Sequence, residues 1–199
     1  MRTSIWDLIF LVGFIAYTGI RGVFKQRTAK VKSVARRLDA VEKALLALVI
    51  PGSLLWPLLY LFTPWLRFAD YELPLFFPWV GLVMMVGSLW LFYRSHADLG
   101  RQWSVTLELR EDHRLIKQGV YRRMRHPMYA SIWLWCIAQG LLLANWLAGW
   151  YALVAFAVMY FIRTPREERM LCEAFGAEYV EYMSQTGRLF PRRRRKSGE

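Results

Sequence analysis

Apolar residues occur in four long runs along the chain, and charged residues lie in blocks between them. The first three runs cover 4–20, 44–66 and 73–92, and each is long enough for a helix to cross a hydrocarbon core of ~30 Å. The last run, 128–162, has 35 residues. Because one span needs only about 20 residues, this run predicts two spans, and the pattern as a whole predicts a membrane protein.

The motif ANWLAGW (144–150) supplies the break within the last run. We read a tight hairpin of two helices there, over 128–145 and 147–162. The predicted fold class is therefore all-α integral membrane, with five transmembrane helices and with residues 1–199 as a single domain. Three prolines inside 44–66 predict kinks in the second span, because a proline frees a helical carbonyl that neighbouring helices must satisfy.

The positive charge lies in the polar blocks between the predicted spans. The chain carries a net charge of +12, and 21–43 and 94–125 each hold eight Lys or Arg residues, whereas RFADYE (67–72) and ANWLAGW hold one between them. The positive-inside rule then places the N-terminus outside and the C-terminus inside the cell membrane. A nucleic-acid-binding protein is disfavoured, because that function leaves the apolar runs unexplained.

Neither the cysteines nor the histidines indicate a metal site. Cys136 lies in an apolar run and Cys172 in a charged segment, without the spacing of metal ligands or of a structural disulfide. The three histidines, His96, His113 and His126, are too scattered along the chain to argue for a shared metal ion. The sequence therefore predicts no bound metal.

Two readings stay open for the basic segment between the first two spans, 29–49. Val31, Val34, Leu38 and Val41 fall on one face of a helix, and basic residues cover the other face. An amphipathic helix of this kind lies in the membrane interface and would continue into the second span. The alternative is a positively charged loop that only sets the topology.

The polar segment 100–127 has features of local structure. SVTLEL (104–109) alternates like a strand, REDH (110–113) reads as a turn, and Gly119 stands where a tight bend is expected. A connection of this length is more often a functional loop than a linker. We therefore expect it to form one wall of a cytoplasmic pocket.

The second polar segment, 163–191, predicts an amphipathic helix. Pro165 suits its first turn, and an apolar stripe follows at helical spacing: Leu171, Phe175, Tyr179 and Tyr182. Such a helix would fold back over the cytoplasmic mouth of the bundle and complete the pocket. A helix lying flat on lipid is the alternative.

The pair His126 and Pro127 stands at the start of the predicted span 128–145, directly after three arginines. Pro127 leaves the amides of the first turn free, with the positive end of the helix dipole facing the cytosol. This end suits a carboxylate or a phosphate. His126 offers a hydrogen bond, and Tyr121 and Tyr129 offer rings and hydroxyls. A purely topogenic role for the arginines is the alternative.

Three stretches together resemble the isoprenylcysteine carboxyl methyltransferase family: HRLIKQGVYRRMRHPMYAS (113–131), RTPREER (163–169) and FGAEYVEYM (175–183). This family is part of a wider group of membrane methyltransferases that includes phospholipid N-methyltransferases. The resemblance covers about 100–191, and the five-span layout and TGRLFP (186–191) look most like its small archaeal members.

The resemblance implies methyl transfer from S-adenosylmethionine, with S-adenosylhomocysteine as product, to a lipophilic or prenylated acceptor among the membrane lipids. It implies catalytic roles for Arg163, at the substrate, and Glu167. These two share a face if the helix continues past 162; an ordinary interfacial ion pair is the alternative. Family members often have glycine where this chain has Ser131. The implied cofactor-binding residues are His113, Arg114, Leu115, Ile116, Tyr121, His126, Pro127, Met128, Tyr129 and Glu167.

Two other functions stay open. One is a membrane reductase of related helical architecture that uses a nicotinamide cofactor, and the other is a non-catalytic module that binds anionic lipids. The chain has no glycine-rich strand-turn-helix fingerprint, which excludes a soluble Rossmann-type methyltransferase. The sequence leaves the acceptor group open among a carboxylate, an amine and a thiol.

Overall fold

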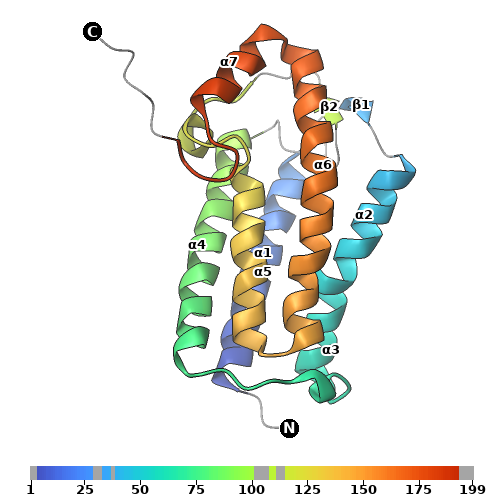
Figure 1. Cartoon of the computed structure of the whole chain (residues 1–199), viewed down its shortest axis with the longest axis vertical. Helices are drawn as coiled ribbons and strands as arrows, with labels where there is room; N and C mark the ends of the chain where they lie inside the picture. Colours follow the sequence, from blue (N-terminus) through green and yellow to red (C-terminus); the bar gives the residue numbers. More distant parts are fainter. Residues whose placement is uncertain (1–3, 29–32, 37–38, 101–107, 111–114, 193–199) are drawn as a thin grey trace.

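The computed structural model describes residues 4–28, 33–36, 39–100, 108–110 and 115–192. Long helices run side by side in an elongated bundle, and α1 begins at the end opposite α7 (Figure 1). The elements in chain order are α1 (Ile5–Thr28), β1 (Ser33–Arg36), α2 (Ala40–Ile50), a π-helical segment (Pro51–Leu55), α3 (Trp56–Phe62), a 3-10 turn (Arg67–Ala69), α4 (Phe76–Leu99), β2 (Glu108–Arg110), a 3-10 turn (Gly119–Arg122), α5 (Pro127–Leu143), a second π-helical segment (Trp146–Trp150), α6 (Tyr151–Phe175) and α7 (Ala177–Gln185).

The outside of the bundle has the composition of a membrane protein. Among the described residues, four helices are long and apolar enough to cross a membrane by length and composition: Ile5–Arg27, Ala40–Phe62, Phe76–Leu99 and Trp146–Phe175. The remaining long helix, α5, is apolar and has 17 residues. Large apolar side chains point outward, as with Val83 at 71% exposure and Phe161 at 70%. The predicted five-helix membrane fold is confirmed.

Several helices are longer than the apolar runs that predicted them. α1 continues to Thr28 and α4 to Leu99, beyond the expected ends at 20 and 92. An apolar run marks the part of a helix that faces hydrocarbon, whereas hydrogen bonding continues through polar residues at the membrane surface. The second span consists of α2, the π-helical segment Pro51–Leu55 and α3, which together we call the second rod. This rod ends earlier than expected, at Phe62 rather than 66, because Thr63 is already extended.

The prolines of the second rod mark changes of helix type. Pro51 opens the π-helical segment, and Pro57 lies in the first turn of α3. Pro57 has no N–H to donate to the carbonyl of Gly52, and the N–H of Trp56 donates to Pro51 instead. The buried amide of Gln139 on α5 fills this role.

The side chain of Gln139 connects three elements in the middle of the bundle. Its Nε2 donates to the carbonyl of Gly52 at 3.0 Å and to that of Ala148, in the second π-helical segment, at 2.6 Å. A backbone carbonyl without a donor is costly in hydrocarbon. Gln139 therefore fixes the second rod against the hairpin of α5 and α6.

The closest helix pair, α4 and α5, approaches through small residues. The hydroxyl of Ser88 donates to the carbonyl of Ser131 at 2.7 Å, and Ser131 itself is fully buried and donates to Met128. A Cβ added at Gly81 would lie 3.0 Å from Leu141. Ser131, at the position where the family that the sequence resembles often has glycine, is thus accommodated without separating α4 and α5.

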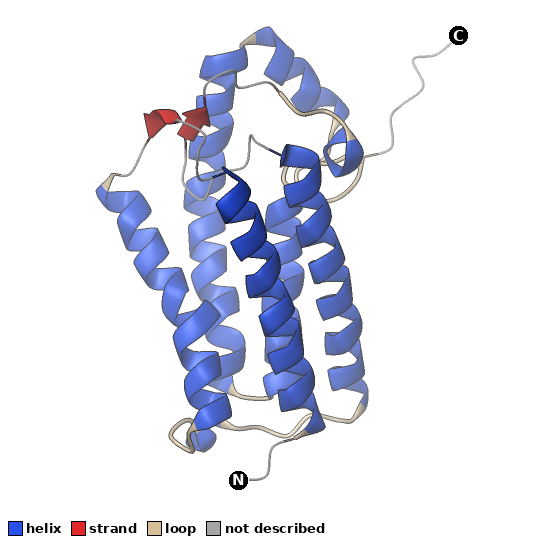
Figure 2. Ribbon diagram, turned by 180° about the vertical axis from the view of Figure 1, so that it is seen from behind, coloured by secondary structure: helices blue, strands red, loops and turns tan. Residues whose placement is uncertain are grey.

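The segment after α1 differs from the interfacial helix that was one reading of 29–49. Residues 33–36 form β1, which pairs antiparallel with β2, and α2 starts only at Ala40. The helical reading is therefore wrong at β1, because a partner strand distant in sequence supplies hydrogen bonds that no local pattern reveals. The strand predicted at 104–109 is confirmed where it is described, at Glu108 and Leu109. Seen from behind, the two strands lie at the same end as α7 (Figure 2).

The C-terminal helix also differs from the prediction. Helix α6 runs without a break from Tyr151 to Phe175, so Pro165 lies in its interior rather than in the first turn of a new helix. The break comes at Gly176, whose φ of 55° suits glycine. The apolar stripe expected on one helix is consequently divided: Leu171 and Phe175 lie on α6, and Tyr179 and Tyr182 lie on α7. Only α7 folds back over the bundle (Figure 1).

Candidate active site

One cavity of about 420 Å³ lies inside the bundle and reaches the end covered by α7. It brings together residues from α1, α2, α4, α5, α6 and α7 that are far apart in the sequence. Most of the predicted site residues line it: Leu115, Ile116, Tyr121, His126, Met128, Tyr129, Arg163 and Glu167. Pro127 is buried beside them as the first residue of α5, while His113 and Arg114 lie outside the described residues.

The cavity has a polar end and an apolar end. Glu167 and Ala152 both line it and lie on the same helix. At a rise of 1.5 Å per residue they are about 22 Å apart along α6. Most of the remaining lining residues are apolar, among them Phe14, Leu54 and Phe156. The cavity therefore extends from the charged residues near the end of the bundle, Arg163 and Glu167, into the apolar part of the candidate membrane span.

The sequence at the start of α5 fixes His126 at the cavity wall. Pro127 occupies the first helical position, and His126 is the N-cap residue, with φ of −125° and ψ of 57°. The imidazole is nearly parallel to the ring of Tyr129, with centroids 5.4 Å apart. Its Nε2 lies 3.1 Å from Oε1 of Glu168, and its Nδ1 lies 4.0 Å from Oε1 of Glu167. Because a carboxylate only accepts, Nε2 carries the proton in the shorter contact.

Tyr129 orients Glu167 across the cavity. Its hydroxyl donates to Oε2 of Glu167 at 2.5 Å, and its ring is buried against Phe156 and Tyr160. Because α6 is unbroken, Arg163 and Glu167 share the face of the helix that borders the cavity, as expected for residues four apart.

Arg163 pairs with a residue that the sequence analysis did not single out. Its Nη1 lies 3.3 Å from Oε1 of Glu42 on α2, and Glu42 is 1% exposed. Asp39 and Glu42 have the spacing of a helix-capping box, which gives Glu42 an ordinary local explanation in the sequence. Only the packing of α2 against α6 reveals the ion pair.

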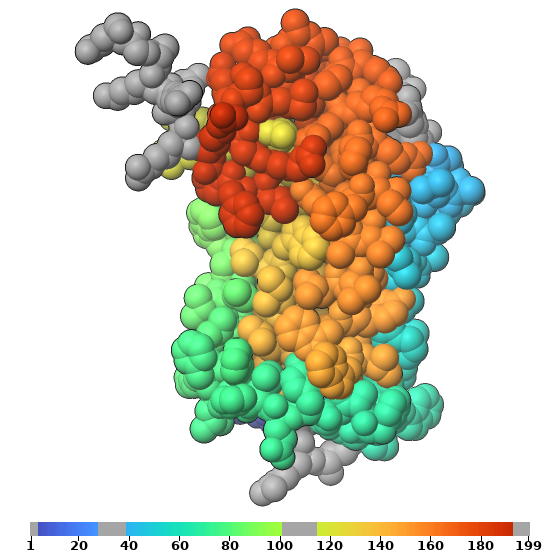
Figure 3. Space-filling model, viewed as in Figure 1, coloured from blue at the N-terminus to red at the C-terminus, as the bar shows by residue number. Residues whose placement is uncertain are grey.

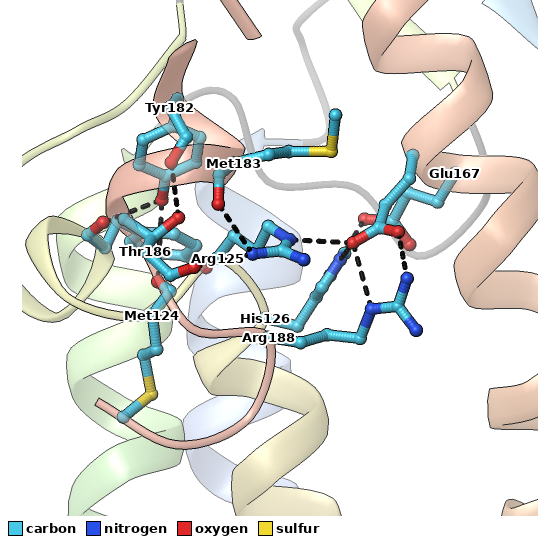
Figure 4. Close-up of polar contacts among 10 residues, drawn as sticks. Met124, Arg125, His126, Glu167, Tyr182, Met183, Thr186 and Arg188 are labelled. Carbon is cyan, nitrogen blue, oxygen red and sulfur yellow. Dashed lines mark hydrogen bonds and ion pairs between the residues drawn. The ribbon is translucent and has the colours of Figure 1, made fainter. Parts of the chain in front are cut away.

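Glu168 is the centre of an ionic cluster at the covered end of the cavity, and its partners Arg125, His126 and Arg188 are labelled in Figure 4. Arg125 donates from Nε at 2.8 Å, and Arg188 donates from Nε at 3.1 Å and from Nη2 at 2.5 Å. The hydrogen bond to Glu168 raises the pKa of the Arg188 guanidinium. With His126, three side chains from two segments, the one before α5 and the one after α7, thus converge on one carboxylate, and none of these contacts is local in sequence.

The chain after α7 is attached to the segment before α5 by its backbone as well. Arg125 N–H donates to the carbonyl of Gly187 at 2.9 Å, and His126 N–H donates to that of Arg188 at 3.0 Å. We call residues 186–192 the C-terminal strap. The space-filling view shows the red C-terminal residues wrapped around the yellow segment that precedes α5 (Figure 3). The polar end of the cavity is therefore closed by paired chain segments.

Two further contacts fix the wall formed by 115–122. The hydroxyl of Tyr182 on α7 donates to the carbonyl of Tyr121 at 2.7 Å, and burial raises the pKa of Tyr182, so the phenol stays protonated. At the predicted bend, Gly119 has φ of 58°, and a Cβ there would lie 2.0 Å from a carboxylate oxygen of Asp98. Asp98 accepts the N–H of Val120 at 2.9 Å.

Tyr179 on α7 is a buried polar residue with its hydroxyl unused. It lines the cavity and is 1% exposed, yet its hydroxyl has no hydrogen-bond partner among the described residues. A buried donor without a partner is costly, so the hydroxyl is suited to a polar ligand. Across the residues that the structure describes, no group of three or more His, Cys, Asp or Glu side chains is placed to hold a metal ion.

An apolar bundle with a covered, charged cavity at one end defines a multi-pass membrane protein with an internal polar site. The family model for phospholipid methyltransferase matches residues 76–178, from α4 to the start of α7. This is more than half of the chain, and the chain belongs to that family.

Curated relatives carry the same resemblance. Protein-S-isoprenylcysteine O-methyltransferase B of Arabidopsis thaliana is 33% identical over 108 residues, which is 51% of this chain and 53% of that protein. The Saccharomyces cerevisiae protein-S-isoprenylcysteine O-methyltransferase is 41% identical over 78 residues, which is 38% of this chain and 32% of that protein. The chain thus spans about half the length of the first of these and a third of the second.

A solved structure shares the fold. The eukaryotic intramembrane Ras methyltransferase, isoprenylcysteine carboxyl methyltransferase, superposes with a TM-score of 0.54 over 92% of this chain and 67% of that chain, at 22% identity. The resemblance to the isoprenylcysteine carboxyl methyltransferase family that the sequence indicated is confirmed.

Proposed function

We propose that the protein transfers a methyl group from S-adenosylmethionine to the carboxylate of a lipophilic acceptor at the cytoplasmic surface of the cell membrane. The observation that carries this proposal is a cavity that is lined by Arg163 and Glu167 and, for the most part, by apolar side chains. An acceptor with one anionic head and one long tail matches both ends of such a cavity. The relatives are named for an acceptor of this kind, a prenylated cysteine.

The residues at the polar end fit the proposed cofactor. Glu167 offers an anion to its positive groups, the free amides at the start of α5 suit its carboxylate, and Leu115 and Ile116 offer apolar contact to its adenine. The unused hydroxyl of Tyr179 offers a further hydrogen bond. When bound, S-adenosylmethionine supplies an electrophilic methyl group on a sulfonium sulfur.

Each side chain then has a defined task in the transfer. Arg163 receives the acceptor carboxylate through two parallel N–H groups, which orients one oxygen toward the reaction site. Glu167 stabilises positive charge near the transferring methyl, and Tyr129 keeps its carboxylate in place. A carboxylate acceptor is already ionised at neutral pH, so no residue has to remove a proton. His126 accordingly serves as a wall whose Nε2 is held by Glu168.

The two ligands are proposed to arrive by different routes. The C-terminal strap and α7 cover the polar end, where a polar cofactor would enter from the cytosol when these segments open. The acceptor would enter sideways between helices, since its tail belongs in the hydrocarbon.

The proposed orientation has a direct test by cysteine labelling. In a variant with Cys136 and Cys172 replaced by alanine, an impermeant maleimide added to intact cells is expected to label Glu72→Cys, in the connection after α3. It is expected to leave Glu199→Cys unlabelled until the cells are permeabilised, because the Lys and Arg residues hold the C-terminus inside. Labelling of Glu199→Cys in intact cells would show the topology to be inverted.

The proposed function is tested with the purified protein in lipid nanodiscs. Calorimetry is expected to show binding of S-adenosylmethionine, and a labelled methyl group is expected to pass to N-acetyl-S-farnesylcysteine. Binding of a nicotinamide cofactor instead would support the reductase, and lipid binding without any cofactor would support the non-catalytic module. Transfer to phosphatidylethanolamine alone would assign an amine acceptor in place of the carboxylate.

Tyr179→Phe is expected to weaken binding of S-adenosylmethionine by about 1 kcal/mol, the net value of one hydrogen bond. The fold should be unaffected, since the hydroxyl makes no bond to the described residues. Calorimetry at constant pH measures the affinity. Tyr93→Phe on α4, half-exposed toward lipid, is the matched control. Equal affinity of Tyr179→Phe and wild type would remove Tyr179 from the cofactor site.

A further inference from the structure

Glu42 is a buried carboxylate whose position the fold alone does not explain. It lies in the first turn of α2 and is 1% exposed, although a charged group at this depth costs several kcal/mol to desolvate. Its ion-pair partner is Arg163, with Oε1 3.3 Å from Nη1. An apolar residue of similar size would often stabilise such a helix contact better than an ion pair.

Local helix capping does not account for Glu42. The N-cap of α2 is Asp39, which accepts the N–H of Glu42 at 2.9 Å. In a capping box the carboxylate at the Glu42 position would return to the N–H of the cap residue. Here neither carboxylate oxygen of Glu42 has a hydrogen-bond donor among the described residues. The side chain is turned away from its own helix and toward α6.

Two ion pairs join α2 to α6, and they differ in environment. Asp39 pairs with Arg166 at the surface, and Glu42 pairs with Arg163 inside. The acids are three residues apart on one helix and the arginines three apart on the other. The side chain of Asp39 is 46% exposed, whereas that of Glu42 is 1% exposed. The outer pair thus offers a control for the inner one, with the same charges between the same helices.

The inner pair also gives Arg163 a partner besides Glu167. Arg163 and Glu167 are four residues apart on one helix, a spacing at which opposite charges attract each other. Arg163 pairs with Glu42, and Glu167 receives the hydroxyl of Tyr129. Both groups consequently line the cavity, and each is held by a residue of a different helix, Glu42 of α2 or Tyr129 of α5.

We propose that Glu42 is a positioning residue that holds the Arg163 guanidinium at the cavity wall, ready for the carboxylate of the acceptor. This inference rests on the proposed function and adds to it a residue outside the segments that carry the family resemblance. Without Glu42, the Arg163 guanidinium loses the contact that fixes it from α2, and the acceptor loses its anchor.

The test compares Glu42→Gln, Glu42→Asp and Asp39→Asn in nanodiscs. In Asp39→Asn the helix cap is retained, because asparagine caps as well as aspartate, but the outer ion pair is lost. For Glu42→Gln we expect the KM for N-acetyl-S-farnesylcysteine to rise about tenfold or more, while kcat at saturating acceptor falls less than about threefold. Glu42→Asp should recover part of the loss, and Asp39→Asn should match wild type. Quenching of tryptophan fluorescence by the same acceptor, without cofactor, gives its affinity independently of turnover.

The kinetic results distinguish a positioning role of Glu42 from a purely structural one. A purely structural Glu42 would reduce the fraction of active protein, which lowers kcat and leaves KM and the acceptor affinity unchanged; that result would overturn the proposal. So would an equal rise in KM for Asp39→Asn. If wild type neither binds nor methylates the acceptor, the proposed function itself fails, and the inference about Glu42 fails with it.

Discussion

Replacing Arg163 with lysine is expected to lower turnover by about 100-fold or more, and Glu167→Gln is expected to do the same, as for the loss of one preorganised electrostatic contact. Lysine keeps the positive charge of Arg163 but cannot offer two parallel N–H groups to a carboxylate. Glutamine keeps the shape of Glu167 but removes the negative charge that faces the sulfonium.

The measurement is the rate of labelled methyl transfer at saturating cofactor and acceptor. Arg166→Lys, one turn along the same helix and paired with the exposed Asp39, is the control and should remain near wild type. Cofactor affinity should fall mainly in Glu167→Gln, which calorimetry measures separately. If both variants at Arg163 and Glu167 turned over normally, neither residue would belong to the reaction.

Glu168→Gln is expected to destabilise the protein by about 3 kcal/mol and to weaken cofactor binding roughly tenfold. Removing one member of a buried ionic cluster leaves its partners uncompensated, at a typical cost of about 3–5 kcal/mol. We expect the lower end, because the side chain of Arg188 is 45% exposed and gains water. The loss of affinity, about 1.4 kcal/mol, follows because His126 and the C-terminal strap are no longer fixed at the covered end.

Thermal unfolding followed by tryptophan fluorescence measures the first effect and calorimetry the second. Glu178→Gln is the control, since Glu178 connects α7 to Lys117 through an ion pair at 2.8 Å in which both side chains are exposed. That variant should change stability by less than about 1 kcal/mol. Unchanged stability and affinity in Glu168→Gln would mean that the cluster neither closes the cavity nor supports its wall.

The features that follow from local pattern were predictable from the sequence. The lengths of the apolar runs gave the helical bundle and the hairpin at 144–150, since each span must bury its own backbone hydrogen bonds. Gly119 and Pro127 were placed correctly because their backbone preferences act on their immediate neighbours. The grouping of Tyr121, His126 and Tyr129 beside Glu167 also agrees with the structure, although their roles stay predictions.

The features that depend on distant contacts were not predictable. Glu42, Glu168 and Arg188 are ordinary charged residues in polar segments, and only the packing of separate elements makes them partners of Arg163 and His126. Pro165 was expected to start a helix, yet α6 continues through it, since tertiary packing overrides a local preference. The strand β1 likewise depends on β2, far away in the chain.

Gln139 implies an order of assembly during synthesis. The second rod is made well before α5, and until α5 arrives the carbonyl of Gly52 lacks the amide that satisfies it. A chain stopped before residue 139 would present this carbonyl to lipid at mid-membrane, at a cost of several kcal/mol. The helices from α1 to α4 are therefore incomplete by themselves, and this carbonyl receives its side-chain donor only when α5 packs against them.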